Sequence, residues 1–393
     1  MASEMMLLTG ADVFTPTRFI RGGTVLVADG EIQSVEPRTN SVPPGTRTID
    51  LTGLKLAPGF IELHFQGVGG HDVWDGRPES MQAISRDLAG FGVTAFTSTS
   101  AYHPTEKFAR LVELLQDESL YRDGARPIGI YLESPFVSEA KRGGIPSDRL
   151  RPPSVRELEP ILAMARGKLR MMTVAPELPG ILDVVEALLA NGVRVAVGHT
   201  NATYDQTRDV IDAGARHATH LWNAMTPFGH REPGAAGAVL LDERVGIELI
   251  LDGIHLHPAT IEMSLRLKGP EKSSIITDAV KAAGMPDGDY RFGDGERIVH
   301  VRGGAPRLDD GRLAGSTLTM DRAVANMVHV VGRPELEAVR MATLSPAQAL
   351  GIDDRKGRIE PGWDADLVVL DEAYSVVGTM VAGEFVYRAK GRL

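Results

Sequence analysis

Two histidines lie at the carboxyl ends of two short apolar runs between Val193 and Gly234. The first run, VRVAV, leads into His199, and the second, RHATH, ends in His220, with an amphipathic segment between them. If both runs are parallel strands joined by one helix, both imidazoles point into the same mouth of a barrel. Neutral imidazoles arranged in this way are good ligands for a transition metal. Two histidines alone are more often unrelated loop residues, so the metal interpretation depends on which residues lie at the ends of the other strands.

Most of the other apolar runs also end in a side chain with ligand or acid–base chemistry. Six of eight run ends carry such groups, namely His64 with Gln66, Glu133, His199, His220, Asp252 with His255, and Asp278. One or two would mean little, because polar residues are common where strands end. Six together favour a site, since metal ligands and proton carriers must converge at this end of a βα barrel.

The side chains Glu133, His199 and His220 have the composition of a catalytic zinc site that leaves one position open for water. Such a metal lowers the pKa of its water from about 15.7 toward about 7 and polarises a carbonyl, which suits amide or ester hydrolysis. Asp278 follows the last strand and is the natural general base for that water, then general acid for the leaving amine. Each residue alone could equally cap a helix or form a salt bridge. The set together favours hydrolysis.

A second group of residues has the chemistry to hold an anion. It comprises Asn223, the Ala224 amide, Arg231 and His255. Arginine binds phosphate through two parallel hydrogen bonds, which makes a phosphate the natural ligand. The glycine-rich turns at 67–70 and 313–316 allow the backbone to approach a ligand closely.

Composition restricts the partners and the metal chemistry. The net charge of −10 offers no basic stripe for nucleic acid, although one phosphate on a small molecule needs only a local Arg or His. The chain has no cysteine, so any metal must be bound by His, Asp or Glu. The N-terminus has no basic region typical of a signal peptide, and no apolar run approaches the roughly 20 residues that span a bilayer. We expect a cytoplasmic protein with no membrane partner.

The elements that must position these residues can be read from the rhythm of the chain. From Ala57 onward, short apolar runs alternate with helical segments of ten or more residues, which is typical of βα units and a parallel sheet. The runs are GFIEL, TAFTST, IGIYL, LRMMTVA, VRVAV, HAT, GIELIL and SSIIT. Eight runs predict a (β/α)8 barrel over 57–350. A doubly wound open sheet is less favoured, because no glycine-rich dinucleotide fingerprint follows the first run.

The two ends of the chain have a different pattern. Residues 5–56 alternate short β-type runs with turns, and Asp29-Gly30 is a strong hairpin signal. The tail returns to the same style, so 1–56 and 351–393 are predicted to share one small sheet. A chain of 393 residues fits one large barrel with such a second domain.

Several segments resemble a known family. They are LAPGFIELHFQGVGG, IYLESPF, GHTNATYDQ, THLWNAMTPFGHREPG, LILDGIHLHP, IITDAV, LAGSTLTMD and EPGWDADLVVLD. On these segments the chain resembles the amidohydrolase superfamily and, within it, the N-acetylglucosamine-6-phosphate deacetylases. The likeness covers nearly the whole length, and the segments around His199 and His220 are the most specific.

The resemblance implies a function and assigns roles to residues. It implies hydrolysis of the N-acetyl group of N-acetylglucosamine 6-phosphate by a metal-activated water, with Asp278 as base and acid. One divalent metal per subunit, zinc or else Fe, Mn or Co, would be bound by Glu133, His199 and His220. Substrate contacts would come from Asn223, Ala224, Arg231, Asp252, His255, Leu313, Ala314, Gly315 and the pair Gly144-Ile145. It also implies a small β-sandwich built from both chain ends, and a homodimer in which Arg231 or His255 serves the neighbouring site.

The chain departs from the family pattern at two positions. Many members have His-x-His after the first strand and bind two metals, whereas here His64 is followed by Gln66. This predicts one tight metal, with a weak second site at His64. The family also has a sugar-contacting His where this chain has Ile145. That change keeps other substrates open, such as N-acetylgalactosamine 6-phosphate or an N-acyl amino acid. A non-catalytic binding protein is less favoured, because the metal set is complete.

Overall fold

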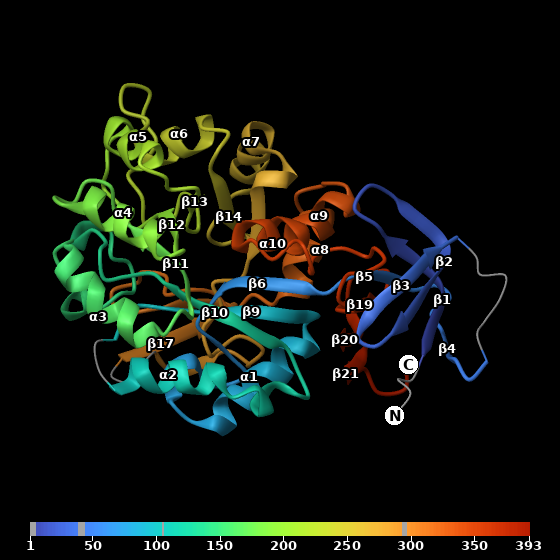
Figure 1. Cartoon of the computed structure of the whole chain (residues 1–393). Helices are drawn as coiled ribbons and strands as arrows, with labels where there is room; N and C mark the ends of the chain where they lie inside the picture. Colours follow the sequence, from blue (N-terminus) through green and yellow to red (C-terminus); the bar gives the residue numbers. More distant parts are fainter. Residues whose placement is uncertain (1–4, 38–43, 104–105, 293–296) are drawn as a thin grey trace.

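The eight expected barrel strands are present, parallel and in chain order. In the computed structural model, which describes residues 5–37, 44–103, 106–292 and 297–393, they form one sheet (Figure 1). Its strands are β6 (Phe60–Phe65), β9 (Val93–Ser100), β10 (Arg126–Leu132), β11 (Leu169–Val174), β12 (Arg194–Val197), β13 (His217–Ala218), β14 (Gly246–Ile250) and β15 (Ser273–Ile276). The predicted barrel, rather than an open doubly wound sheet, is confirmed.

The first and last strands meet beside the expected catalytic residues. The backbone N–H of Asp278 donates to the carbonyl of His64 at 2.9 Å, and the N–H of Gln66 donates to Ala279 at 2.7 Å. The closure of the barrel therefore brings residues from opposite ends of its sequence into direct contact.

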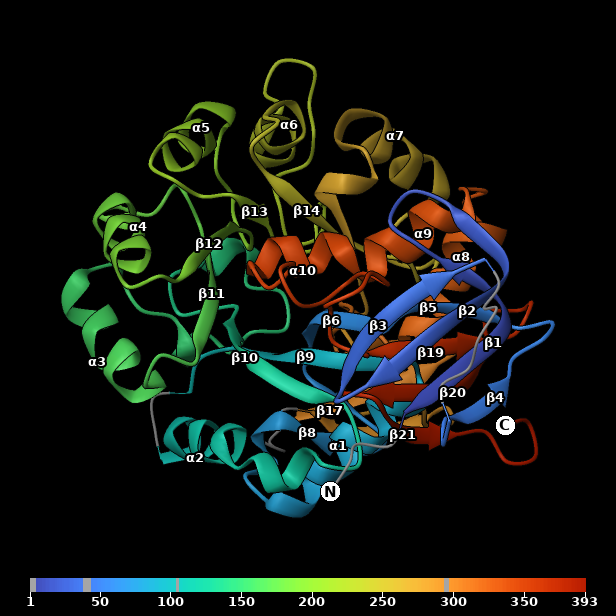
Figure 2. The same ribbon diagram turned by 45° about the vertical axis from the view of Figure 1, so that its right-hand side comes forward.

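Helices surround the barrel (Figure 2). They are α1 (Pro78–Gly90), α2 (Glu106–Gln116), α3 (Val155–Ala165), α4 (Ile181–Ala190), α5 (Tyr204–Asp212), α6 (Gly234–Leu241), α7 (Pro258–Lys268), α8 (Met320–His329), α9 (Glu335–Ala342) and α10 (Leu344–Leu350). Short 3-10 helices lie at Val73–Asp75, Glu118–Tyr121, Glu139–Lys141, Ser147–Arg149 and Pro270–Lys272. Within the described ranges, no helix has the length and apolar character needed to cross a lipid bilayer.

Helix α5 connects β12 and β13, the strands whose carboxyl ends lead into His199 and His220. Thr203 accepts a hydrogen bond from the backbone of Gln206, whose side chain accepts one in return from the Thr203 backbone N–H. This capping box fixes where the helix begins. The buried residues Val210 and Ile211 on its inner face pack into the barrel core. Helix α5 therefore holds His199 and His220 one βα unit apart.

The two chain ends share one sheet, as predicted. It contains β1 (Met6–Phe14), β2 (Phe19–Ala28), β3 (Glu31–Glu36), β4 (Arg47–Asp50), β5 (Lys55–Pro58), β19 (Leu367–Leu370), β20 (Val376–Val381) and β21 (Glu384–Arg388). Antiparallel pairing of β5 with β19 joins the ends. Asp29 and Gly30 have φ angles of 55° and 78° in the predicted hairpin turn. The strands form one continuous hydrogen-bonded sheet with its own core, which includes Leu8, Val25 and Val377.

A small antiparallel sheet between β15 and α8 was not predicted. It consists of β16 (Gly288–Phe292), β17 (Arg297–Arg302) and β18 (Ala305–Arg307), and it packs around Val299 and Val301. A two-stranded ladder of β7 (Gly67–Val68) and β8 (His71–Asp72) follows the first barrel strand. The β16–β18 sheet contributes arginines to the wall of the cavity at the carboxyl ends of the barrel strands.

Candidate metal centre

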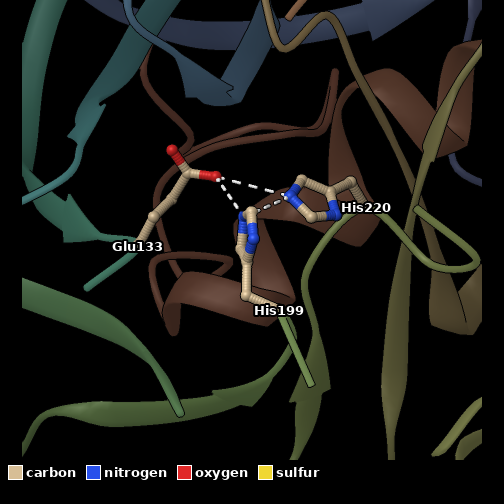
Figure 3. A group of neighbouring side chains, drawn as sticks. All are labelled: Glu133, His199 and His220. Carbon is tan, nitrogen blue, oxygen red and sulfur yellow. Dashed lines mark hydrogen bonds and ion pairs between the residues drawn. The ribbon is translucent and has the colours of Figure 1, made fainter. Parts of the chain in front are cut away.

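Three predicted ligands converge at the carboxyl ends of the barrel strands (Figure 3). Glu133 follows β10, His199 follows β12 and His220 follows β13, and all three are buried. Glu133 Oε1 lies 3.2 Å from His199 Nε2 and 3.4 Å from His220 Nε2. The two Nε2 atoms are 3.0 Å apart. Three donor atoms thus face one common point.

This spacing fits a tetrahedral metal ion. Zinc bonds to imidazole nitrogen and carboxylate oxygen are about 2.0–2.2 Å long, so neighbouring donors in a tetrahedron lie roughly 3.3–3.6 Å apart, close to the separations observed here. Nδ1 of His199 lies 2.8 Å from the carbonyl oxygen of Lys141 and must carry its proton there. Its Nε2 consequently presents a lone pair to the common point.

A second group of donors adjoins the first. His64 Nε2 lies 3.3 Å from Glu133 Oε1 and 3.5 Å from Asp278 Oδ1, and it has no hydrogen-bond partner among the described residues. Gln66 donates from Nε2 to Glu133 at 3.2 Å and to Asp278 at 3.4 Å. The amide of Gln66 therefore bridges the two carboxylates and contributes no imidazole there.

The electrostatics of this cluster favour a positive charge at its centre. Burial opposes ionisation of Glu133, yet His64 and the other imidazoles outweigh burial and hold the pKa of this carboxyl well below its usual range. Burial likewise disfavours the charged form of His64, but Glu133 and Glu248 raise its pKa well above that of a free imidazole. A proton or a metal cation satisfies this demand.

Asp278 is placed to exchange protons beside the cluster. It is buried at the carboxyl end of β15, and burial, reinforced by the charge of Glu133, raises its pKa. A carboxylate with a raised pKa is a more effective proton carrier near neutral pH. Its carbonyl accepts from the N–H of Ser316 at 2.8 Å, which links it to the turn 313–316.

The backbone at these positions adopts sparsely populated conformations. His199, His220 and Asp278 have φ angles of 45°, 27° and 49°, and Ala224 has 52°. Left-handed conformations in residues other than glycine cost free energy and cluster at functional sites. Here they turn each side chain away from the barrel wall and into its mouth.

Glu248 lies beneath the cluster and was not predicted. It is fully buried in β14. Its Oε2 lies 3.0 Å from His64 Nδ1 and accepts from the His220 backbone N–H at 3.0 Å, and its Oε1 lies 3.1 Å from His217 Nε2. Because a carboxylate only accepts, both imidazole nitrogens carry protons. When His64 is neutral, its Nε2 therefore carries a lone pair that faces Glu133 and Asp278.

A signal for Glu248 exists in the sequence, because it interrupts the apolar run GIELIL just as Glu62 interrupts GFIEL. Glu62 accepts from the His64 N–H at 3.0 Å and from the Thr277 hydroxyl at 2.7 Å. Two carboxylates inside apolar strands thus support the residues at the strand ends.

A cavity of about 720 Å³ opens over the cluster. The predicted site residues that line it are Glu133, Gly144, Ile145, His199, His220, Asn223, Ala224, His255, Asp278, Leu313, Ala314 and Gly315. Gln66, Trp74 and His103 also line it, as do several arginines. Three predicted residues do not: Arg231 is exposed outside the cavity, Asp252 lies behind His255, and His64 is fully buried beneath the lining.

Asp252 orients His255 toward the cavity. Its Oδ2 lies 2.6 Å from His255 Nδ1, and its Oδ1 accepts from the backbone N–H groups of Ile254 and His255 at 2.8 Å. Burial lowers the pKa of His255, but Asp252 and Asp278 outweigh that effect and raise it. A His255 that is readily protonated suits contact with an anion.

Ile145 is buried in the cavity wall, in a loop held by arginine side chains. Arg312 donates to the carbonyl of Gly143 at 2.7 Å, and Arg297 donates to Gly144 at 2.7 Å. Arg142 donates to the carbonyl of Ile145 itself at 2.6 Å. Arg297 begins β17 of the unpredicted sheet and Arg312 follows β18, so the segment between β15 and α8 fixes the loop position.

A family model agrees with this fold and site. Residues 56–386 match the family described as "Amidohydrolase family". The match spans the barrel and reaches into the terminal sheet. It therefore includes the candidate metal ligands Glu133, His199 and His220, together with His64 and Asp278.

Individual relatives agree as well. The N-acetylgalactosamine-6-phosphate deacetylase of Escherichia coli O157:H7 is 38% identical over 91% of this chain and 93% of its own. The N-acetylglucosamine-6-phosphate deacetylase of Lysinibacillus sphaericus is 36% identical, over 91% and 92%. A variant of N-acetyl-D-glucosamine-6-phosphate deacetylase from Mycobacterium smegmatis, solved in complex with N-acetyl-D-glucosamine 6-phosphate, is 37% identical. It superimposes with a TM-score of 0.88 over 98% of this chain and 99% of its own.

The Glu248 carboxylate is expected to support metal binding without contacting the metal. The substitution Glu248→Gln removes the acceptor that one of its two imidazoles needs, so the orientation of His64 and the His220 backbone is loosened. Loss of such an outer partner typically lowers metal affinity by about 10- to 100-fold. Competition with a chelator measures the zinc affinity of the variant.

The matched control for this test is Glu243→Gln, which makes the same charge change at an exposed position five residues away. Its zinc affinity should equal that of the unmodified chain. Equal affinity in Glu248→Gln would show that Glu248 plays no part in forming the site.

Proposed function

The chain belongs to the amidohydrolase family, and from this premise we propose that it hydrolyses the N-acetyl group of N-acetylglucosamine 6-phosphate. The products are acetate and glucosamine 6-phosphate. The observation that carries the proposal is the convergence of Glu133, His199 and His220 with Asp278 at the base of one cavity. These are the groups that amide hydrolysis by a metal-dependent enzyme requires.

Glu133, His199 and His220 would hold a divalent cation, which when bound would supply Lewis acidity for the amide carbonyl and for the attacking water. Asp278 takes the proton of that water on its carboxylate as the carbon–oxygen bond forms. The same carboxyl then delivers the proton to the amine nitrogen as the carbon–nitrogen bond breaks. Its raised pKa suits both halves of this transfer.

We propose one tightly held divalent ion per chain, with zinc as the favoured metal. The two imidazoles and one carboxylate also suit Fe, Mn and Co, so the donor set alone does not select among them. His64 adds a weaker neighbouring position, because Gln66 supplies only a weak amide ligand where a second imidazole would strengthen it.

The 6-phosphate is assigned to the end of the cavity that carries His255. Asp252 fixes the ring of His255 and favours its charged form. Asn223 and the Ala224 amide line the same cavity and are proposed to contact the sugar. Leu313, Ala314 and Gly315 also line the cavity.

We further propose a homodimer in which Arg231 of a second copy reaches the phosphate. Arg231 lies in the exposed segment 227–232 and does not line the cavity of its own chain. Phe228, in the same segment, has 56% of its surface exposed, which suits burial against another subunit. The charged, phosphorylated substrate does not cross membranes unaided, which supports a cytoplasmic location.

A second substrate, N-acetylgalactosamine 6-phosphate, is favoured by two observations. One relative that is 38% identical bears that name, and Ile145 offers no hydrogen bond to a sugar hydroxyl. The two sugars differ only in the orientation of one hydroxyl. N-acetylglucosamine 6-phosphate remains the primary substrate proposal, because several of the related proteins are named as deacetylases of that sugar.

Replacing Asp278 by Asn is expected to abolish most hydrolysis while the metal stays bound. The amide cannot accept the water proton, and general base catalysis is worth about 10²- to 10⁴-fold in rate. Acetate release measures the activity, and elemental analysis measures the metal. The exposed Asp354→Asn serves as the charge-matched control and should keep full activity. Substantial acetate release by Asp278→Asn would remove Asp278 from the mechanism.

Activity is expected to depend on the 6-phosphate through His255. In an acetate-release assay, N-acetylglucosamine 6-phosphate should have a higher kcat/KM than its N-acetylgalactosamine isomer, unphosphorylated N-acetylglucosamine or an N-acetyl amino acid. His255→Gln should raise KM for the phosphorylated sugar by about tenfold or more, because a charge-assisted hydrogen bond is lost. The unphosphorylated sugar is the internal control and should be unaffected. A preference for N-acetyl amino acids would overturn the substrate assignment.

A further inference from the structure

A second cavity lies at the opposite end of the barrel from the metal cluster. Its volume is about 660 Å³. Arg194, His217 and Gly246 line it, and each is the first residue of its strand, whereas the metal ligands follow the strand ends. Helix α10 crosses this end of the barrel and contributes Ser345 to the wall (Figure 2). We call this space the lower cavity.

Positive charge is concentrated in the lower cavity of an otherwise acidic chain. The net charge of the protein is −10. Yet the basic side chains that the structure describes in this lining are Arg194, Arg216, Arg244, Lys272 and Arg340, against the acidic Glu271 and Asp353. Five positive charges face two negative charges. A cavity of this size and sign is suited to a small anionic ligand.

Arg244 is already neutralised by two carboxylates. Its guanidinium lies 2.6 Å from Asp212 and 2.6 Å from Asp242. Both carboxylates lie outside the lining of the lower cavity. The remaining basic side chains decide what the lower cavity can bind.

Three of those side chains lie beyond ion-pair distance of any acidic group that the structure describes. Arg194, Arg216 and Lys272 form no ion pair with any residue in the described part of the chain. Arg216 donates only to the backbone carbonyls of Ile211 and Ala215, through one of its terminal nitrogens. Its other nitrogens stay available for a ligand.

Two further observations concern the other basic groups of the lower cavity. Arg340 pairs with Glu271 across 3.8 Å, but its Nε is buried without a hydrogen-bond partner among the described residues. Burial lowers the pKa of Arg194, and the neighbouring Arg170 adds to that effect against the attraction of Asp353. A bound anion would relieve both conditions.

We propose that the lower cavity binds a small phosphorylated metabolite with at least two negative charges, through Arg194, Arg216 and Lys272. Guanidinium groups match phosphate oxygens with paired hydrogen bonds, and the lysine adds a mobile point charge. The cavity volume lies within the range of small-molecule sites. This site is independent of the proposed deacetylation, since none of its residues lines the catalytic cavity.

Buried polar groups separate the two cavities. His217 forms part of the inner wall of the lower cavity, and its Nε2 lies 3.1 Å from Glu248 Oε1. The other oxygen of Glu248 contacts His64 beside the metal cluster. A ligand in the lower cavity would therefore lie beneath this layer and would not contact the deacetylation substrate.

Isothermal titration of the metal-loaded full chain with fructose 1,6-bisphosphate tests the proposal. The double variant Arg216→Gln/Lys272→Gln should bind this probe about tenfold more weakly, or lose one class of site, because charge-assisted hydrogen bonds are removed. Inorganic phosphate, which carries one group instead of two, should bind the unmodified chain more weakly than the bisphosphate.

The control is Arg156→Gln/Arg266→Gln, which removes two positive charges from the exposed faces of α3 and α7. It should bind the probe like the unmodified chain. Unchanged thermal unfolding and unchanged acetate release in the cavity variant establish that the fold and the catalytic site are intact. If the double variant does not fold, Lys272→Gln carries the same comparison. Binding of the probe with equal affinity and stoichiometry by the cavity variant, or no binding by the unmodified chain, would overturn the proposal.

Discussion

Buried carboxylates and imidazoles in direct contact at one end of the barrel constrain the rest of the structure. Glu133 faces His64, His199 and His220 at 3.2–3.4 Å, and Asp278 adjoins them. Removing such charges from water is costly unless each is paired. A cation between the donors offsets that cost, and a supporting layer must keep the donors aimed at it. Glu248 provides that support by holding His64, His217 and the His220 backbone together.

The barrel makes this arrangement possible because its strand ends meet at one mouth. Each strand delivers one group, and the left-handed backbone at His199, His220 and Asp278 turns those groups inward. The helices bury the strands and keep their spacing, while the loops and the small β16–β18 sheet shape the cavity above. Stability and chemistry are thus divided between the barrel wall and its mouth. The proposed anion site uses the amino ends of the same strands, where no metal ligand lies among the described residues.

Much of this could be predicted from the sequence, because the signals are local. Eight apolar runs predicted the barrel, Asp29-Gly30 predicted a hairpin, and the first polar residues after the runs include the side chains that converge at the barrel mouth. Glu248 was visible as a charge inside an apolar run, but its partner His64 is 184 residues away, and no local pattern reveals that contact. The lower cavity collects basic residues that carry no signal one by one. Whether Arg231 serves a second subunit depends on assembly, which a single chain does not specify.

The central claim is that Glu133, His199 and His220 hold one divalent cation. The most direct test is a zinc titration of the metal-free chain, with the bound ions counted per chain. We predict one tightly bound ion in the unmodified chain and in His64→Ala, and loss of that ion in Glu133→Gln and in His199→Ala. Tight binding of one zinc ion by Glu133→Gln and His199→Ala, with the same affinity as the unmodified chain, would contradict the account.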